Sequence, residues 1–421
     1  MKFILSLALK NLTRYRRRTI ITSIAIAAGL SIFIMLDALL LGMEQESERN
    51  IIWYETASAK IMTAENFEHM EFLSLKYPID NPEKITSLLN DQGFRSTTRI
   101  TFGAELLVYE DPFPADGSTQ VKIAAVDPES DGDVYRFTEI IEKGKFLQKG
   151  EEGILLGSWL AEDLQADVGY PVTLLTRSRD GYYQTIDLEV TGIFNCPNPY
   201  VNRATALIPL ETADYYLQME GGVTEIAVSL PTSADPAEEA AAINQLLQQQ
   251  GNPENAALGV YTWQELAYDY LQFAAAKQGG SKVILFLVFI IAAVGISNTM
   301  LMAVYERIRE LGMMRALGMD DGKLRAAFIL EAGGIGFIGS VFGVLIGSIL
   351  TWYFVRRGID FTFMMRNMDL GYRVAGVMYG TWNVWTIITA FIAGIVISMI
   401  IAVFPTRKVV RMEVADALHH Q

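Results

Sequence analysis

Residues that could perform metal or nucleophilic chemistry are scarce in this sequence. It has three histidines, His69, His419 and His420, and a single cysteine, Cys196. Zinc sites and His-based catalytic triads need several such side chains at fixed spacings, and the sequence has neither an HExxH motif nor a cysteine pair. We therefore expect no metal site, no triad and no internal disulfide.

Phosphate-binding chemistry is also missing. The phosphate loop of nucleotide hydrolases has the pattern GxxxxGK followed by Ser or Thr. The two Gly-Lys pairs, at Gly144 and Gly322, lack both the earlier glycine and the following hydroxyl residue. Acidic residues are abundant, but abundance alone does not define a catalytic pair. We therefore expect that the chain is not an enzyme and does not hydrolyse ATP itself.

Residues 298–331 have an unusual composition for a connection between two apolar segments. They leave one apolar run at Tyr305 and enter a second near Ala326. A connection needs only polar turn residues, whereas here apolar and charged residues alternate. The mixture is typical of a short amphipathic helix that packs on something, and lipid headgroups are one such partner. The apolar members are Met313, Met314, Ala316, Leu317, Met319 and Leu324, and the charged members are Glu306, Arg307, Arg309, Glu310, Arg315, Lys323 and Arg325.

Four apolar runs with almost no charge are each long enough to cross a bilayer, at about 20 residues per crossing. We predict a membrane α-helical fold with four transmembrane helices. The first is expected to be an uncleaved signal anchor, and Pro405 is expected to end the fourth. In the third, Gly339, Gly343 and Gly347 recur every four residues, a spacing that lets helices pack closely in lipid. The expected spans are residues 19–42, 279–304, 326–355 and 384–404.

The distribution of charge orients these helices. Residues 1–18 carry six basic residues and no acidic one, and residues 405–421 carry three basic residues. Both ends are therefore expected in the cytoplasm, together with the loop at residues 305–325, whereas residues 356–383 form an outer loop. Residues 1–18 fit either an amphipathic segment lying on the inner leaflet or plain positive flanking sequence.

Residues 43–278 are strongly acidic and are expected outside the cytoplasm. They carry 38 of the 48 acidic residues and 15 of the 34 basic ones, a net charge of −23, which leaves +9 for the rest of the chain. An acidic exterior favours solubility. It argues against nucleic acid as a partner, because phosphates bind basic surfaces.

This acidic region is expected to be α+β, in two subdomains. Helices that begin at Pro82 and Pro236 follow an Asx N-cap, end near a glycine and lie between β-branched segments. We expect one subdomain built from both ends of the region, with a strand-rich insertion at about residues 103–222. Thr262 begins a capping box, and no breaker follows before Gly279. A rigid helix is therefore expected to run from the outer domain into the second span.

Two turns of the insertion are candidates for contact with a partner. One contains an Asp-Gly hairpin signal, and the other is rich in proline and is expected to form a stiff, exposed turn, although such turns are commonly only turns. The candidate residues are Arg177, Arg179 and Asp180 in the first turn, and Pro197, Pro199 and Tyr200 in the second.

Several segments spread over essentially the whole chain carry a resemblance to a known family. The most specific is Glu306-Arg307 followed by Glu310-Leu311-Gly312-Met313-Met314-Arg315-Ala316-Leu317-Gly318; weaker ones are Ile296 to Met300, Asn11-Leu12, Phe404 to Lys408, Ala415 to Leu418, Ile154 to Ala161 and Asp167-Val168-Gly169. Together they resemble the FtsX-like permease family of ABC transporters. That group includes the MacB efflux pumps and, closest in kind, the lipoprotein-release permeases LolC and LolE.

The resemblance implies a bacterial inner-membrane permease that pairs with a second permease, either itself or a paralogue. Each permease would dock on a separate cytoplasmic ATPase, so that ATP and Mg²⁺ bind the partner and no cofactor binds this chain. The segment from Arg309 to Lys323 would be the coupling helix. Its implied coupling residues are Glu306, Arg307, Arg309, Glu310, Gly312, Met314, Arg315, Ala316, Leu317, Gly318 and Lys323.

The family also implies work by mechanotransmission, in which the outer domain moves without a substrate path through the membrane. The expected function is lipoprotein release, with a periplasmic lipoprotein carrier as a possible partner. The alternatives are MacB-like efflux of drugs, peptides or toxins, and signalling to an outer partner such as a cell-wall hydrolase. Unlike MacB pumps, this chain has no fused ATPase. Its hairpin near residue 180 is shorter than the long hook of LolC, which favours a LolE-like or unassigned subunit.

Overall fold

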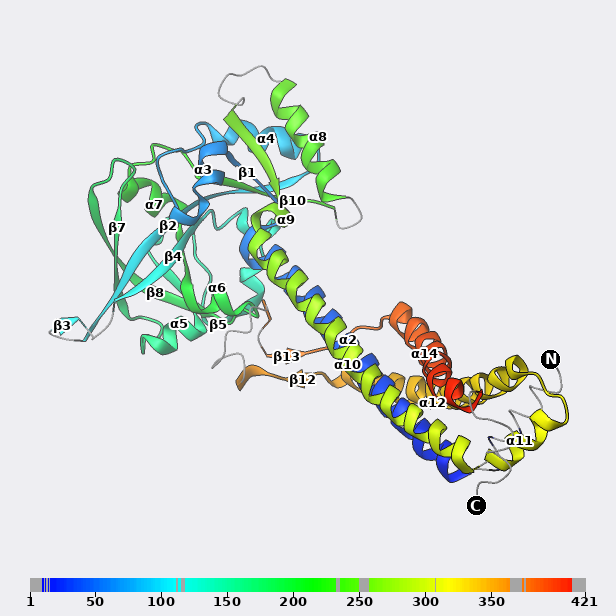
Figure 1. The fold of residues 1–421 in the computed structure, drawn as a ribbon. Coiled ribbons are helices and arrows are strands. Elements are labelled where there is room, and N and C mark those ends of the chain that lie inside the picture. Colours follow the sequence, from blue (N-terminus) through cyan, green and yellow to red (C-terminus); the bar gives the residue numbers. More distant parts are fainter. Residues whose placement is uncertain are drawn as a thin grey trace. The chain divides into compact units, whose positions relative to one another are not determined.

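The computed structural model describes residues 10–410, apart from residues 11, 13, 15, 111–112, 115–117, 232–234, 250–256, 307, 364–372 and 375 and some side chains within its helices and strands. It divides into two compact units. The helical unit comprises Met1–Glu44, Ala274–Asp360 and Val377–Gln421, and the sheet unit comprises Gln45–Phe273 and Phe361–Gly376. Figure 1 labels the helices and strands of both units.

The sheet unit has two strand–helix–strand halves that share one sheet. The first half is β1 (Ala59–Thr63), α4 (Pro82–Asp91) and β2 (Arg95–Glu110), and the second is β10 (Glu225–Ser229), α8 (Pro236–Gln249) and β11 (Leu258–Thr262). The strand order β11-β1-β10-β2 interleaves the halves, and the neighbouring strands are antiparallel. This is a split βαβ arrangement, and it needs both ends of the region to be complete.

The insertion extends the same sheet. Strand β2 pairs with β10 near its start and with β4 and β7 further along. The expected insertion boundary at residue 103 therefore falls inside β2, because one long strand belongs to both subdomains. The other elements of the insertion are β3 (Phe113–Pro114), β4 (Thr119–Val126), β5 (Ile141–Gly144), β6 (Ile154–Gly157), α5 (Ser158–Asp163), β7 (Pro171–Arg177), β8 (Tyr183–Phe194), α6 (Pro199–Ala204), β9 (Thr205–Pro209) and α7 (Leu210–Leu217).

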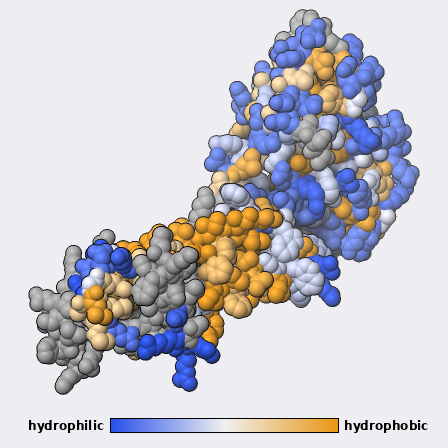
Figure 2. All heavy atoms as spheres, turned by 90° about the vertical axis from the view of Figure 1, so that its right-hand side faces the viewer, coloured by the Kyte–Doolittle hydropathy of each residue, from blue (hydrophilic) through white to orange (hydrophobic). Residues whose placement is uncertain are grey.

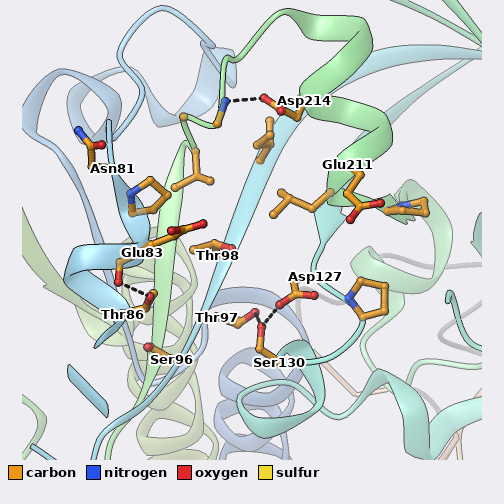
Figure 3. A pocket seen from close by; sticks show the side chains of 18 of the residues that line it. Asn81, Glu83, Thr86, Ser96, Thr97, Thr98, Asp127, Ser130, Glu211 and Asp214 are labelled. Atoms are coloured by element: carbon orange, nitrogen blue, oxygen red, sulfur yellow. Dashed lines mark hydrogen bonds between the residues drawn. The ribbon is translucent and has the colours of Figure 1, made fainter. Parts of the chain in front are cut away.

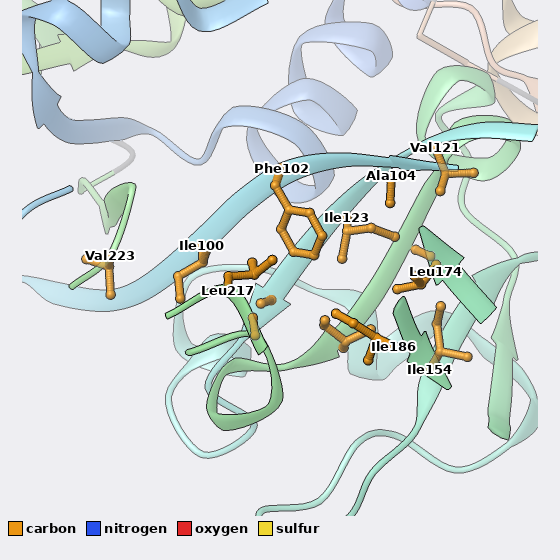
Figure 4. Close-up of a cluster of buried hydrophobic side chains, with 14 of the residues drawn as sticks. Ile100, Phe102, Ala104, Val121, Ile123, Ile154, Leu174, Ile186, Leu217 and Val223 are labelled. Atoms are coloured by element: carbon orange, nitrogen blue, oxygen red, sulfur yellow. The ribbon is translucent and has the colours of Figure 1, made fainter. Parts of the chain in front are cut away.

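Side chains alternate between the two faces of this sheet, and each face carries its own cluster of buried residues. One face carries a mainly aliphatic cluster that includes Ile100, Phe102 and Ile123 (Figure 4). Helices α4 and α8 contribute Leu89 and Ile243 to this cluster. The opposite face carries an aromatic cluster in which the ring of Phe137 lies edge-to-face on Tyr54 and Phe194. Tyr54 belongs to η1 (Ile52–Thr56), a π-helix; the unit also has α3 (Ala64–Glu68) and the 3₁₀ turns η2 (Met70–Phe72), η3 (Asp131–Asp133) and η4 (Phe137–Ile140).

The helical unit is built from long apolar helices. Among the described residues, three segments are long and apolar enough to cross a membrane: Thr19–Thr56, Asp321–Arg357 and Val384–Thr406. The expected span at 279–304 lies in helix α10, many of whose side chains are outside the described set. Figure 2 shows hydrophobic residues gathered over the helices. The elements are α2 (Arg16–Ile51), α10 (Tyr268–Glu306), α11 (Ile308–Ala316), α12 (Asp321–Arg357), β12 (Ile359–Asp360), β13 (Val377–Met378) and α14 (Val384–Val410).

Three expected helix ends differ in the structure. Helix α2 continues past residue 42 to Ile51, because the intervening residues are good helix formers without a proline. Helix α14 continues through Pro405; the proline removes one backbone hydrogen bond, and the Thr406 hydroxyl donates to the Val403 carbonyl at 2.9 Å in the same turn.

The third difference concerns the helix expected to start at Thr262. Its capping box is present, but it caps only the short helix α9 (Trp263–Leu266). Ala267 leaves helical geometry at φ −105° and ψ 30°, and α10 begins at Tyr268. A continuous helix of 39 residues therefore starts one turn later than expected.

Candidate functional site

The segment expected to couple to an ATPase folds as α11, a tight turn and the start of α12. The backbone N–H of Gly318 donates to the Arg315 carbonyl, and that of Met319 donates to the Met314 carbonyl, both at 3.0 Å. Gly318 has φ +90°, the left-handed conformation that glycine favours. These features define a Schellman motif, which ends a helix sharply and redirects the chain.

Apolar contacts lock the turn from inside. Leu324 and Phe328 of α12 are 1% and 4% exposed and form a small cluster with Met314 and Met319. Met319 precedes the N-cap of α12 and Leu324 is its fourth residue, so their contact is a hydrophobic staple. Met314 packs against the same cluster, and it occupies the helix position whose apolar side chain commonly accompanies a Schellman motif. One small cluster therefore fixes both the end of α11 and the start of α12.

Charged groups fix the turn from outside. Asp320 is the N-cap of α12, and its carboxylate accepts from the Gly322 N–H at 3.0 Å. Arg315 Nε lies 3.1 Å from Asp321 Oδ1, which bridges the two helices. An acid in the first turn of α12 also faces the positive end of the helix dipole. These interactions help to fix the orientation of α12 relative to α11.

Several other described residues of the segment are exposed. Leu317 is 88% exposed and Met313 is 48% exposed, and Ala316, Gly318 and Lys323 are exposed beside them. We call Met313, Ala316 and Leu317 the turn patch. Glu310 forms an exposed ion pair with Arg14 at 3.3 Å. Arg307, the side chains of Glu306 and Arg309, and the exposure of Gly312 lie outside what the structure describes.

The three glycines of α12 lie against helix α2. A Cβ on Gly339 would come within 2.8 Å of Ile26 Cβ, one on Gly343 within 2.9 Å of Leu30 Cβ, and one on Gly347 within 3.1 Å of Ile34 Cβ. The facing residues are spaced by four, as are the glycines. Close backbone approach of this kind is how small residues join helices in lipid.

The first candidate partner loop is an exposed hairpin between β7 and β8. Arg177 and Asp180 are exposed and Arg179 is partly buried. The Arg177 guanidinium donates to the Tyr183 hydroxyl at 2.7 Å and lies over the ring, so this arginine is held by its own hairpin.

The second candidate loop is not the exposed turn that its prolines suggest. Asn198 is fully buried and caps α6 by accepting from the Tyr200 N–H at 3.1 Å. Pro197 and Pro199 are partly buried, and only Tyr200 of the three candidates is exposed. Proline suits the first helical position, so the segment begins a helix instead of forming a free loop.

A groove of about 670 Å³ lies in the sheet unit between α4, the start of β2 and α7 (Figure 3). Several of its polar groups bond to the protein itself. Ser130 donates to Asp127 at 2.7 Å and accepts from Thr97 at 2.9 Å, and Asp214 accepts from the Gly221 N–H at 2.8 Å. These bonds fix the walls of the groove and do not form an acid–base pair.

A buried ion pair crosses the sheet face that carries the aromatic cluster. Lys60 Nζ donates to both carboxylate oxygens of Glu225 at 2.9 Å, and both side chains are under 10% exposed. Burial disfavours the ionised carboxyl, but the cations Lys60 and Lys122 outweigh it and hold the pKa of Glu225 below its ordinary value. Burial, together with the Lys60 charge, lowers the pKa of Lys122.

A second buried pair lies beside it. Arg99 Nη2 is 2.7 Å from Asp131 Oδ1, and the guanidinium lies 3.3 Å from the ring centroid of Tyr135. Burial raises the pKa values of both Asp131 and Tyr135, with Arg99 opposing the shift. The first pair joins β1 to β10, and the second joins β2 to the loop at 131–137. We therefore interpret both pairs as structural. Among the described residues, no cluster of three His, Cys, Asp or Glu could hold a metal ion.

Two family models match the chain. The FtsX-like permease C-terminal model matches residues 282–414, and the MacB-like periplasmic core domain model matches residues 19–246. The chain therefore belongs to the family of FtsX-like permeases with a MacB-like periplasmic core domain. The turn at Gly318 lies inside the first match, and the interleaved strand–helix–strand halves lie largely inside the second.

Named relatives place the chain more closely. It is 24% identical to the lipoprotein-releasing system transmembrane protein LolC of Neisseria meningitidis serogroup B, over 72% of this chain and 73% of the relative. It is 22% identical to LolE of Haemophilus influenzae, over 94% and 93%, and 27% identical to the macrolide export ATP-binding/permease protein MacB of Nitrobacter winogradskyi, over 57% and 37%. The chain is an ABC transporter permease of the LolC/LolE and MacB kind.

Proposed function

We propose that this chain is the permease subunit of an ABC transporter that releases lipoproteins from the outer leaflet of a bacterial inner membrane. The observation that carries the coupling part of this proposal is the turn patch. Leu317 and Met313 are exposed apolar residues on a turn whose interior is fixed by Leu324 and Phe328. A rigid turn with an apolar exterior suits a docking site on another protein.

The ATPase would be a separate subunit that binds ATP and Mg²⁺ and supplies the energy of hydrolysis. This chain would contribute a rigid lever. Helix α11 follows α10 in the chain almost directly and is locked to α12 by Arg315 and Asp321. A push on the turn patch would therefore act on α10 and α12 together. Because α10 is one continuous helix of 39 residues, it can transmit the push along its length.

The proposed topology places both termini and the coupling turn in the cytoplasm and the sheet unit outside. Its support is the positive charge of residues 1–18 and the net charge of −23 on residues 43–278. A second permease, either a copy of this chain or a paralogue, would complete the assembly. The choice of lipoproteins as cargo is supported by relatives whose printed names describe a lipoprotein-releasing system and which match over most of the chain.

The test is reconstitution of the permease with its copurifying ATPase in proteoliposomes that contain a labelled lipoprotein. We expect ATP-dependent transfer of the lipoprotein to a soluble carrier, and we expect Leu317→Asp to abolish it. Active ATP hydrolysis without transfer would contradict the proposal. Transport of a macrolide or peptide under the same conditions would favour the efflux function named for the MacB relative, and binding of a hydrolase to the sheet unit would favour signalling.

A further inference from the structure

The sheet unit contains a short segment from a distant part of the chain. Residues 361–376 lie between α12 and α14 in sequence, yet they belong to the sheet unit with Gln45–Phe273. Two helices of the helical unit are thus linked in sequence through a segment that is part of the other unit.

Arg373 is bound through its backbone by the last turns of α2. The Asn50 side chain donates to the Arg373 carbonyl at 2.8 Å, and the Arg373 N–H donates to Ser47 Oγ at 3.1 Å. Ser47 and Asn50 are 0% and 1% exposed. Burial of a polar side chain costs free energy unless the side chain is hydrogen-bonded. Ser47 and Asn50 each form a hydrogen bond to the backbone of Arg373.

The side chain of Arg373 makes the second set of contacts. Its guanidinium lies 3.4 Å from the ring centroid of Tyr200, and its Nε lies 3.4 Å from Glu55 Oε2. The side chain of Arg373 is only 16% exposed. A cation over an aromatic ring is worth more when it is shielded from water, so this contact is stronger than a surface pair of the same kind.

Glu55 connects these contacts to the core of the sheet unit. Its Oε2 also accepts from Asn198 Nδ2 at 2.9 Å, and Asn198 caps α6. Glu55 lies in η1, a π-helix that ends at Ala57 with φ +58° and ψ −172°. Such a conformation is rarely adopted by residues other than glycine, and π-helical turns are frequent at functional sites. The contacts of Arg373 therefore meet at a distorted joint between α2 and β1.

We propose that Arg373 is a positioning residue that anchors the α12–α14 connection to this joint throughout the transport cycle. We call Arg373, Glu55, Tyr200, Ser47 and Asn50 the anchor. Movement of α12 and α14 then reaches the sheet unit through the anchor, in addition to the route along α10. This inference rests on the proposed function, because it assumes an ATP-driven movement, but the anchor itself can be tested without a cargo.

The first experiment measures amide hydrogen exchange in the full chain without ATPase or cargo. Arg373→Ala is expected to raise exchange about tenfold in peptides that contain residue 373 and in the end of α2, since loss of roughly 1.4 kcal/mol opens a contact tenfold. The control is Arg177→Ala, which removes an arginine from a tyrosine ring within one hairpin and is expected to leave those peptides unchanged. Unchanged exchange in Arg373→Ala would overturn the anchor.

The second experiment replaces the anchor by a covalent bond. In a Cys196→Ala background, Ser47→Cys with Arg373→Cys introduces cysteines at two positions that are already in contact, because Ser47 Oγ lies 3.1 Å from the Arg373 backbone nitrogen. When reduced, this variant and Arg373→Ala should hydrolyse ATP but transport at least about fivefold less per ATP, and oxidation should restore transport. A mere loss of folding would lower both activities together, and oxidation would not restore the ratio.

The two proposals fail in different ways. If the wild-type complex hydrolyses ATP but moves no lipoprotein, the cargo assignment fails, and the exchange experiment still decides the anchor. If the wild type transports normally and Arg373→Ala transports equally well per ATP, the anchor has no role in coupling, and the proposed function stands. Inhibition by oxidation of the double-cysteine variant would show that the anchor must open during the cycle, which contradicts the proposal.

Discussion

Arg315 and Asp321 form an ion pair across the Gly318 turn, with Arg315 Nε 3.1 Å from Asp321 Oδ1. The pair joins the last turn of α11 to the first turn of α12, and Met314, Met319 and Leu324 pack inside the same turn. The segment is thus held by charge on one side and by apolar contact on the other. Contacts within the turn therefore fix the angle between α11 and α12.

The left-handed backbone at Gly318 gives the first prediction. A Cβ at this position meets no other atom within 4 Å, but φ is +90°, so Gly318→Ala costs only conformational energy, about 1–2 kcal/mol. We expect weaker binding of the ATPase and lower coupled transport with an otherwise folded chain. Gly318→Asn should be less harmful, because Asn tolerates this conformation. Copurification and transport assays would measure both variants, and equal losses in the two would show that backbone conformation is not the cause.

The ion pair gives the second prediction. Arg315→Asp places two acids together at the turn and should weaken the ATPase complex, whereas the exchange Arg315→Asp with Asp321→Arg should recover part of the loss. The Arg315 side chain is 18% exposed and that of Asp321 is 44% exposed, so the pair contributes about 0.5–1 kcal/mol. A double-mutant cycle on ATPase binding measures this energy. A cycle with no coupling term would mean that Arg315 acts alone on the partner.

The turn patch gives the third prediction. Leu317 is 88% exposed, so Leu317→Asp removes almost no contact within the chain. We expect unchanged folding but at least about tenfold weaker binding of the ATPase, since burial of a leucine at an interface contributes 1.5–3 kcal/mol. Phe72→Asp is a matched control, because Phe72 is 79% exposed on the sheet unit. If both variants lost ATPase affinity to a similar extent, the turn patch would not be a specific docking site for the ATPase.

The sequence pattern predicts a packed helix in this segment, but it does not predict which of its side chains face inward and which face outward. The mixture of methionine, leucine and charge indicated a helix that packs on something, yet Met313 faces outward while Met314 faces inward. Helix α11 has only nine residues, too few for periodicity to define a face. The Schellman motif and the staple separate the two methionines, and both depend on where the helix ends, which patterns locate least well.

Arg373 shows a second limit. Its sequence neighbours carry no motif that indicates a contact with Asn50, which is 323 positions away. The prediction of an exposed turn at residues 197–200 was wrong for a related reason. Proline restricts the backbone equally in a loop and at a helix start, and only burial of Asn198 distinguishes the two. Long-range packing thus decides what local chemistry leaves open.

The buried Lys60–Glu225 pair gives the fourth prediction, on stability against pH. Because the folded pKa of Glu225 lies below the ordinary value of 4.5, its contribution is fully present above that value and is lost as pH falls through the folded pKa. Glu225→Gln leaves Lys60 buried without its carboxylate and should cost about 3–5 kcal/mol at neutral pH. It should also flatten the pH dependence of unfolding below pH 4.5.

Thermal and urea unfolding of the full chain at several pH values would measure both effects. The control is Asp167→Asn, which removes one partner of the exposed pair with Lys143 and should leave stability unchanged. If the Glu225→Gln variant had the same free energy of unfolding as the wild type at neutral pH, the ion pair would contribute no net stability.

The close contact of α12 with α2 gives the fifth prediction. A Cβ on Gly343 would lie 2.9 Å from Leu30 Cβ and 3.1 Å from the Ala27 carbonyl oxygen, so Gly343→Ala requires the helices to separate slightly and Gly343→Leu forces them apart. Overpacking of this kind costs about 1–3 kcal/mol. We expect thermal stability in detergent to fall in the order Gly, Ala, Leu, with transport falling in parallel. Leu345→Phe adds volume to the same helix at a residue that is 53% exposed and should be tolerated. If Leu345→Phe were the more damaging change, the contact that α12 needs for transport would lie on that face, against another subunit, and not against α2.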